Sequence, residues 1–232
     1  MENVMPFASQ SSPANNIGRE TAKILLDIEA VNFRPQQPYV LTSGRVSPVY
    51  IDCRKLISYP QERRRVIKMA VDILDGAVGF DAIDAVAGGE TAGIPYAAWI
   101  AEARGLPMLY VRKKAKGFGR NAQIEGDIGD ASRVLLVEDL ATDGSSKLNF
   151  INAMRTAGAQ VSDVFVVFFY DIYQGTTENL NEAGVRLHYL ATWRDVVEEA
   201  ERGKRFSADA IAAVRGFLDD PVAWSTAHGG KD

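Results

Sequence analysis

The chain has 232 residues, of which 47% are apolar, and this is enough to bury the core of one α/β domain. Its formal net charge of −4 provides no overall basic character that would indicate nucleic-acid binding. A single cysteine, Cys53, excludes an internal disulfide and a zinc cluster built from cysteines. We expect Cys53 to be a core residue rather than a nucleophile, because no histidine lies near it in the pattern.

The N-terminal residues 1–16 are polar and rich in serine, asparagine and proline. They lack the basic and apolar regions of a signal peptide, so we expect a flexible tail before a single domain over residues 17–232. No apolar run approaches membrane-spanning length, and we therefore expect a cytoplasmic protein.

The predicted elements begin with helices at 20–31 and 61–74, which enclose two short strands at 39–42 and 48–53. From residue 60 onward strands alternate with helices. The expected strands are 83–87, 108–112, 133–137, 164–170 and 186–191. Of the helices between and after them, the first is expected to end before Gly105 and the others at residues 157, 183 and 218. This alternation predicts an α/β fold with a central parallel sheet flanked by helices. Residues 17–60 are expected to form a small hood, with the core from residue 61.

The most informative stretch is 133–147. Its apolar run predicts a buried strand that ends in two carboxylates, Glu138 and Asp139, before a small polar loop and a helix. Ligands bind at strand ends in open α/β sheets, and a loop that enters a helix presents backbone N–H groups to an anion. The stretch therefore predicts a site for a ribose 5-phosphate group.

An ordinary strand–turn–helix joint is the alternative interpretation, with Asp143 and Ser145 as turn and cap residues. The spacing of a Walker A loop is absent. Adjacent carboxylates at a strand end need a cation, sugar hydroxyls or a basic neighbour. This need favours a binding site over a simple joint.

A basic loop follows the strand at 108–112. Five of the nine residues from 112 to 120 are lysine or arginine, and two are glycine. Residues 123–126 are typical of a return strand, so we expect a long mobile hairpin. A solvated surface loop or a small nucleic-acid patch would also explain the charge. A cationic loop that closes over a site would stabilise a multiply charged leaving group and exclude water.

The stretch at 134–146 resembles the motif by which type I phosphoribosyltransferases bind 5-phosphoribosyl 1-diphosphate (PRPP). Three further blocks, at 41–48, 88–95 and 112–116, resemble the orotate phosphoribosyltransferase family. The resemblance implies Mg²⁺-dependent transfer of ribose 5-phosphate from PRPP to orotate. The products would be orotidine 5′-monophosphate and pyrophosphate, in the de novo synthesis of UMP.

The resemblance also implies roles for individual residues. Lys116 and Asp139 would be catalytic, and Mg²⁺ would be held mainly through PRPP. PRPP would be bound by Arg112, Lys113, Lys116, Glu138, Asp139, Leu140, Ala141, Thr142, Asp143, Gly144, Ser145 and Ser146. Orotate would be bound by Thr42, Tyr50, Ile51 and Thr142. A homodimer is implied, because the family supplies the loop lysine to the neighbouring subunit.

Three positions depart from the family pattern. Phe118 stands where many members have histidine, Thr91-Ala92 where many have Tyr-Lys, and Ile172 where many have an arginine that faces the orotate carboxylate. Arg45 and Arg194 are candidates to replace that arginine.

Two alternative functions remain at this point: a phosphoribosyltransferase for another base, and a PRPP-sensing regulator without turnover. A regulator would be expected to carry a DNA-binding domain or a basic RNA-binding face, and the chain shows neither. The loop lysines favour an enzyme.

Overall fold

The computed structural model describes residues 13–41, 43–115, 123–127 and 132–231. Its centre is a six-stranded sheet in the order β10-β9-β8-β5-β6-β7. Neighbouring strands are parallel except β7, which pairs antiparallel with β6. The strands are β5 (Ala85–Gly89), β6 (Met108–Val111), β7 (Ile124–Glu125), β8 (Arg133–Ala141), β9 (Gln160–Phe169) and β10 (Arg186–Thr192). The predicted α/β architecture is confirmed.

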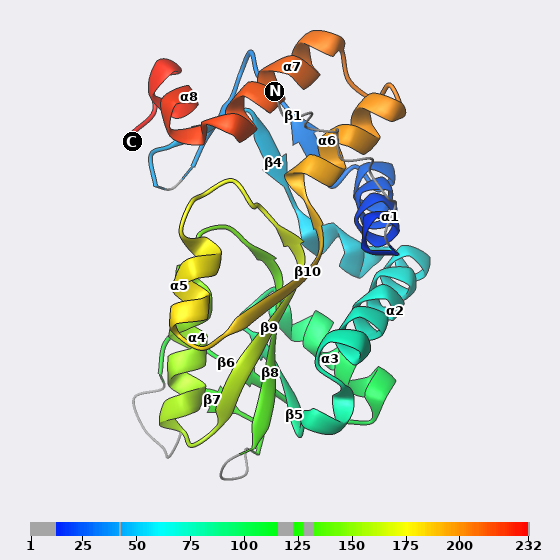
Figure 1. Ribbon diagram of the computed structural model, residues 1–232, viewed down its shortest axis with the longest axis vertical. Coiled ribbons are helices and arrows are strands. Elements are labelled where there is room, and N and C mark those ends of the chain that lie inside the picture. The colour runs from blue at the N-terminus through cyan, green and yellow to red at the C-terminus, as the bar shows by residue number, and fades with distance from the viewer. Residues whose placement is uncertain (1–12, 42, 116–122, 128–131, 232) are drawn as a thin grey trace, which may run out of the picture.

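Helices cover both faces of this sheet (Figure 1). α2 (Pro60–Ala77) and α3 (Gly93–Arg104) pack on one face, and α4 (Ser145–Thr156) and α5 (Thr176–Glu182) pack on the other. β8 lies between them and is buried on both sides, which explains its continuous apolar run. Consecutive residues of β8 belong to two separate hydrophobic clusters: Leu135 lies in one cluster and Leu136 in the other. Because side chains alternate along a strand, Glu138 and Asp139 leave β8 toward opposite faces.

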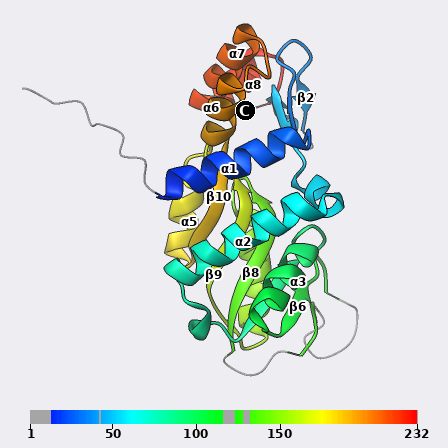
Figure 2. The ribbon, with the colours of Figure 1, turned by 90° about the vertical axis from the view of Figure 1, so that its right-hand side faces the viewer.

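The remaining elements gather at the end of the molecule where β10 leads into α6 (Figures 1 and 2). Two small antiparallel pairs, β1–β4 and β2–β3, lie there. The elements are α1 (Pro13–Asp27), β1 (Val31–Phe33), β2 (Tyr39–Val40), β3 (Val46–Ser47), β4 (Val49–Ile51), α6 (Trp193–Arg202), α7 (Ala208–Asp219) and α8 (Pro221–Ala227). Two 3-10 helices, Cys53–Ser58 and Phe80–Ala82, complete the described elements.

Several predicted boundaries are wrong. The helix predicted over 20–31 is α1, which ends at Asp27 because the chain turns at Glu29 and Ala30 and enters β1 at Val31. Cys53, placed in a strand by its pattern, begins a 3-10 helix and is buried. β8 continues through Ala141, because Leu140 and Ala141 still pair with β9.

The division into a tail, a hood and a core stays a prediction. Residues 1–12 lie outside the described part of the chain, and α1 already begins at Pro13. None of the described helices has both the length and the hydropathy that a membrane-spanning segment needs.

Candidate active site

A cavity of about 670 Å³ lies where β5 and β8 end. Four of the residues predicted to bind PRPP line it: Lys113, Glu138, Asp139 and Ser146. Arg112 and residues 140–145 do not line it. The cavity therefore unites the acidic end of β8 with the start of the basic loop, two segments that are separate in the sequence.

The two carboxylates of β8 are almost entirely buried, with exposures of 7% for Glu138 and 8% for Asp139. Asp139 Oδ1 accepts a hydrogen bond from the Leu140 amide at 2.9 Å. Glu138 Oε2 lies 3.6 Å from Nζ of Lys147. Burial raises the pKa of Glu138 to about 7 against the opposing effect of Lys147, and burial also raises the pKa of Asp139. The cavity thus contains two acceptor groups that are costly to bury without a ligand.

The loop between β8 and α4 has the form of a helix N-terminus. Gly144 adopts a left-handed φ of 77° directly before α4. The Ser145 amide and hydroxyl both donate to Asp143 Oδ1, at 3.0 and 2.8 Å. Asp143 and Ser145 therefore make the turn and cap bonds of an ordinary joint, and the cavity beside Ser146 is the feature that such a joint does not require.

The basic segment begins where β6 ends. The Lys113 amide donates to Glu90 Oε2 at 2.7 Å, which ties the segment to the loop after β5. Arg112 Nη1 lies 3.4 Å from Glu125 Oε1 on β7, and β7 is the predicted return strand. Lys116 and Phe118 lie outside the described residues.

Of the residues expected to bind orotate, the three that the structure describes, Tyr50, Ile51 and Thr142, do not line this cavity. Ile51 is buried on β4, and Tyr50 is half-buried with its ring centroid 5.3 Å from that of Tyr39. Thr142 follows β8 and is half-buried, and its carbonyl accepts a bond from Thr176. Thr42 lies outside the described residues. The assignment of these residues to orotate therefore stays a prediction.

The two arginines considered for the orotate carboxylate, Arg45 and Arg194, lie in different surroundings. The Arg45 guanidinium lies 5.4 Å from the ring centroid of Tyr173, the neighbour of Ile172. Arg194 instead opposes the effect of burial on the pKa of Asp171 and lines a separate small cavity on α6 and α7.

Sequence reasoning missed three residues of the site. Arg54 and Glu90 line the cavity, and Arg54 Nε bonds to Asp52 Oδ1 at 2.8 Å. Arg54 carries no distinctive spacing, whereas Glu90 lies within the block at 88–95 that resembles the family. Lys147 did carry a signal, because a cation in the first turn of a helix opposes the helix dipole.

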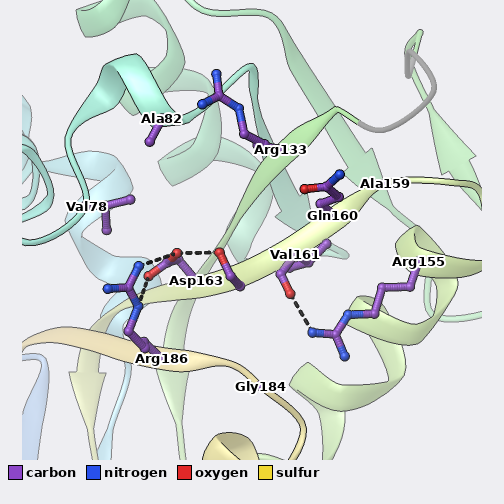
Figure 3. Close-up of a pocket in the computed structure, with 11 residues that line it drawn as sticks. Val78, Ala82, Arg133, Arg155, Ala159, Gln160, Val161, Asp163, Gly184 and Arg186 are labelled. Atoms are coloured by element: carbon purple, nitrogen blue, oxygen red, sulfur yellow. Dashed lines mark hydrogen bonds and ion pairs between the residues drawn. The ribbon is translucent and has the colours of Figure 1, made fainter.

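A second cavity, of about 520 Å³, lies at the opposite end of the sheet, where β8, β9 and β10 begin (Figure 3). Three arginines line it, and each bonds to the protein itself. Arg133 pairs with Asp84, Arg186 pairs with Asp163, and Arg155 donates to the carbonyls of Val161 and Ala183. These bonds join strands and helices at the amino end of the sheet, so we place the candidate site in the first cavity.

Comparison with known proteins identifies the family of the chain. No family model matches the chain. An orotate phosphoribosyltransferase of Cereibacter sphaeroides (strain ATCC 17029 / ATH 2.4.9) is 54% identical over 217 residues, 93% of each protein. The solved orotate phosphoribosyltransferase of Aeropyrum pernix has a TM-score of 0.66 and 31% identity over 78% of this chain and 99% of its own. Leishmania donovani UMP synthase has a TM-score of 0.74 and 28% identity, over 87% of this chain and 42% of that protein. The chain belongs to the orotate phosphoribosyltransferase family.

Proposed function

We propose that this chain transfers ribose 5-phosphate from PRPP to orotate, giving orotidine 5′-monophosphate and pyrophosphate. The observation that carries the proposal is the pair of buried carboxylates, Glu138 and Asp139, that opens into a cavity beside Lys113 and Ser146. Membership of the family supports orotate as the base. The alternatives of another base and of a sensor without turnover have no support from the relatives, which are named as orotate enzymes.

We assign the roles as follows. Glu138 and Asp139 accept hydrogen bonds from the ribose hydroxyls, and residues 142–146 hold the 5-phosphate at the start of α4. Arg112, Lys113 and Lys116 neutralise the pyrophosphate, and Arg54, which also lines the cavity, adds a further cation. C1 of the ribose passes through an oxocarbenium-like state, so the protein acts by positioning the reactants and stabilising the departing charge.

Magnesium is part of this proposal. The phosphate and sugar oxygens of PRPP are the hard oxygen donors that Mg²⁺ prefers. The described residues contain no group of three or more His, Cys, Asp or Glu side chains that could hold a metal. We therefore expect the phosphate and ribose oxygens of PRPP to supply most ligands, and the ion to offset the charge of the pyrophosphate.

For orotate we assign Arg45, Tyr50, Ile51, Thr42 and Thr142. Arg45 supplies a cation over the ring of Tyr173, which follows Ile172, the position where many members of the family have an arginine.

A homodimer with Lys116 acting in the neighbouring subunit belongs to the same proposal, as does a cytoplasmic location.

Lys116→Ala should lower kcat by roughly 10²–10³ while KM changes far less, because a cation that acts on the departing charge is lost. Mixing Lys116→Ala with Asp139→Ala should restore part of the activity, since mixed dimers would contain one intact site. Each variant alone is the control. No rescue, or a Lys116→Ala rate within about threefold of wild type, would count against these roles.

A panel of bases with PRPP and Mg²⁺, followed by pyrophosphate release, tests the choice of base. We expect release with orotate only. Equal release with a purine would overturn the assignment of orotate.

A further inference from the structure

Lys147 is a buried cation that the roles above do not use. It is the third residue of α4, and only 6% of its side chain is exposed. Its Nζ donates to Ser146 Oγ at 3.2 Å and lies 3.6 Å from Glu138 Oε2. Burial costs an ammonium group its hydration, and the first turn of a helix is electrostatically the wrong end for a cation. The position of Lys147 therefore requires compensating negative charge. Glu138 forms an ion pair with it, and Lys147 also lowers the pKa of Asp139 and of Asp143.

The carboxylate of Glu138 lies against Gly89 on β5, where there is no side chain to displace it. A Cβ atom added to Gly89 on β5 would stand 1.6 Å from Glu138 Oε1. Among the described residues, Oε1 has no hydrogen-bond partner, although it is buried. One carboxylate oxygen thus faces Lys147, and the other is a buried acceptor without a partner among the described residues.

The charged groups around Glu138 come from three elements. Lys147 on α4 and Lys113 after β6 favour the ionised form, and Asp139 on β8 disfavours it. Burial is the largest influence and raises the pKa of Glu138 to about 7. Lys147 lowers the pKa of Glu138, so the loss of Lys147 would raise this pKa further and leave less of the carboxyl ionised at neutral pH. A neutral carboxyl carries a proton that must itself be donated, and this weakens it as an acceptor for sugar hydroxyls.

We propose that Lys147 is a positioning residue that keeps Glu138 ionised and oriented toward the ribose of PRPP. The proposal rests on the proposed function, because it presumes that Glu138 binds the ribose hydroxyls. Lys147 acts through Glu138 and has no contact with the reacting atoms. Its removal should therefore change how PRPP use depends on pH.

The test compares Lys147→Met with wild type by measuring kcat/KM for PRPP between about pH 6 and pH 9. We expect the acid limb of Lys147→Met to move upward by about one pH unit or more, a roughly tenfold loss at pH 7 that shrinks at high pH. Lys147→Arg, which keeps the charge, should follow the wild-type profile more closely. Lys68→Met removes an exposed lysine of α2 and should leave the profile unmoved.

A loss of the same factor at every pH, or no loss, would overturn the proposal. Failure of the proposed function would look different, because wild type itself would then not consume orotate. In that case calorimetric binding of PRPP across the same pH range reports on Lys147 directly, with the same expected shift.

The double variant Glu138→Gln/Lys147→Met covers the case in which Lys147→Met folds but is too unstable for kinetic measurements. It removes both charges, so it should unfold at a higher urea concentration than Lys147→Met. A double variant no more stable than Lys147→Met would show that the two residues are not coupled, which would overturn the proposal.

Discussion

At the scale of single residues, Gly89 shows how a missing side chain shapes the site. The Gly89→Ala methyl group would overlap Glu138 Oε1 and also approach Phe150 on α4 to 2.7 Å. We expect it to displace the carboxylate, to lower kcat/KM for PRPP by at least about tenfold, and to cost about 1–3 kcal/mol of stability by overpacking. Steady-state kinetics and urea unfolding measure the two effects.

Gly76→Ala is the matched control, because nothing lies within 4 Å of a Cβ at Gly76 on α2. It should keep wild-type activity and unfold at the same or a higher urea concentration. A Gly89→Ala enzyme with wild-type kinetics would show that the position of Glu138 is not critical.

Part of the site can be predicted from the residues, and part cannot. Glu138 and Asp139 follow from an apolar run that ends in two acids, since this pattern places both at the end of a buried strand. Arg54 cannot be found this way, because it reaches the cavity from a 3-10 helix whose place depends on tertiary packing. The burial of Lys147 beside Glu138 is likewise a property of packing, although its position in the first helical turn gives a hint.

At the scale of elements, Asp163 joins β9 to β10 at the amino end of the sheet. Its Oδ1 lies 2.7 Å from His188 Nε2 and 3.0 Å from Arg186 Nε, and its side chain is 6% exposed. Burial raises the pKa of Asp163, but hydrogen bonds from His188, Ser162 and Arg186 outweigh it and hold the pKa at about 2.

Asp163→Asn should therefore lower the free energy of unfolding by about 2 kcal/mol at pH 7. A lowered pKa contributes stability above the unfolded value of about 4, and this contribution is lost as the pH falls through about 2. The difference in urea unfolding between wild type and Asp163→Asn should accordingly shrink between about pH 5 and pH 2. A difference that stays constant over this range would refute the ionic origin. Activity at neutral pH should change little, because the pair lies at the far end of the sheet.

The strands of the central sheet are predictable because burial on both faces imposes long apolar runs, as in β8 and β9. The short antiparallel strand pairs are harder to predict from the sequence, because β2 and β3 have two residues each and depend on contacts distant in the sequence. The predicted elements also omit α6, although Thr192 and Asp195 form a capping box at its start.

At the scale of the whole molecule, the last described residues hold the segment that precedes β4. Ser225 on α8 is fully buried, and its Oγ accepts from the Val46 amide at 3.0 Å and donates to the Lys231 carbonyl at 2.9 Å. The Lys231 amide donates to the Gly44 carbonyl at 3.0 Å. The turn that carries Arg45 is therefore held by residues far along the chain. Ser225 and Val46, for example, are 179 positions apart in the sequence.

Ser225→Ala should raise KM for orotate several-fold and change KM for PRPP less, because it loosens the turn with Arg45 and leaves the β8 carboxylates in place. The loss of stability should be about 1–2 kcal/mol, since the Val46 amide is left without its acceptor. Thr226→Ala, at an exposed neighbouring position, is the control. Equal effects on both KM values would mean that α8 acts on the fold as a whole.

The measurement that tests the central claim most directly is the ultraviolet absorbance of orotate mixed with this protein, PRPP and Mg²⁺, beside a control without PRPP. The account predicts a loss of orotate that depends on PRPP, which would also show that the chain tolerates Phe118 and Ile172. An unchanged absorbance from folded protein that binds PRPP would contradict it.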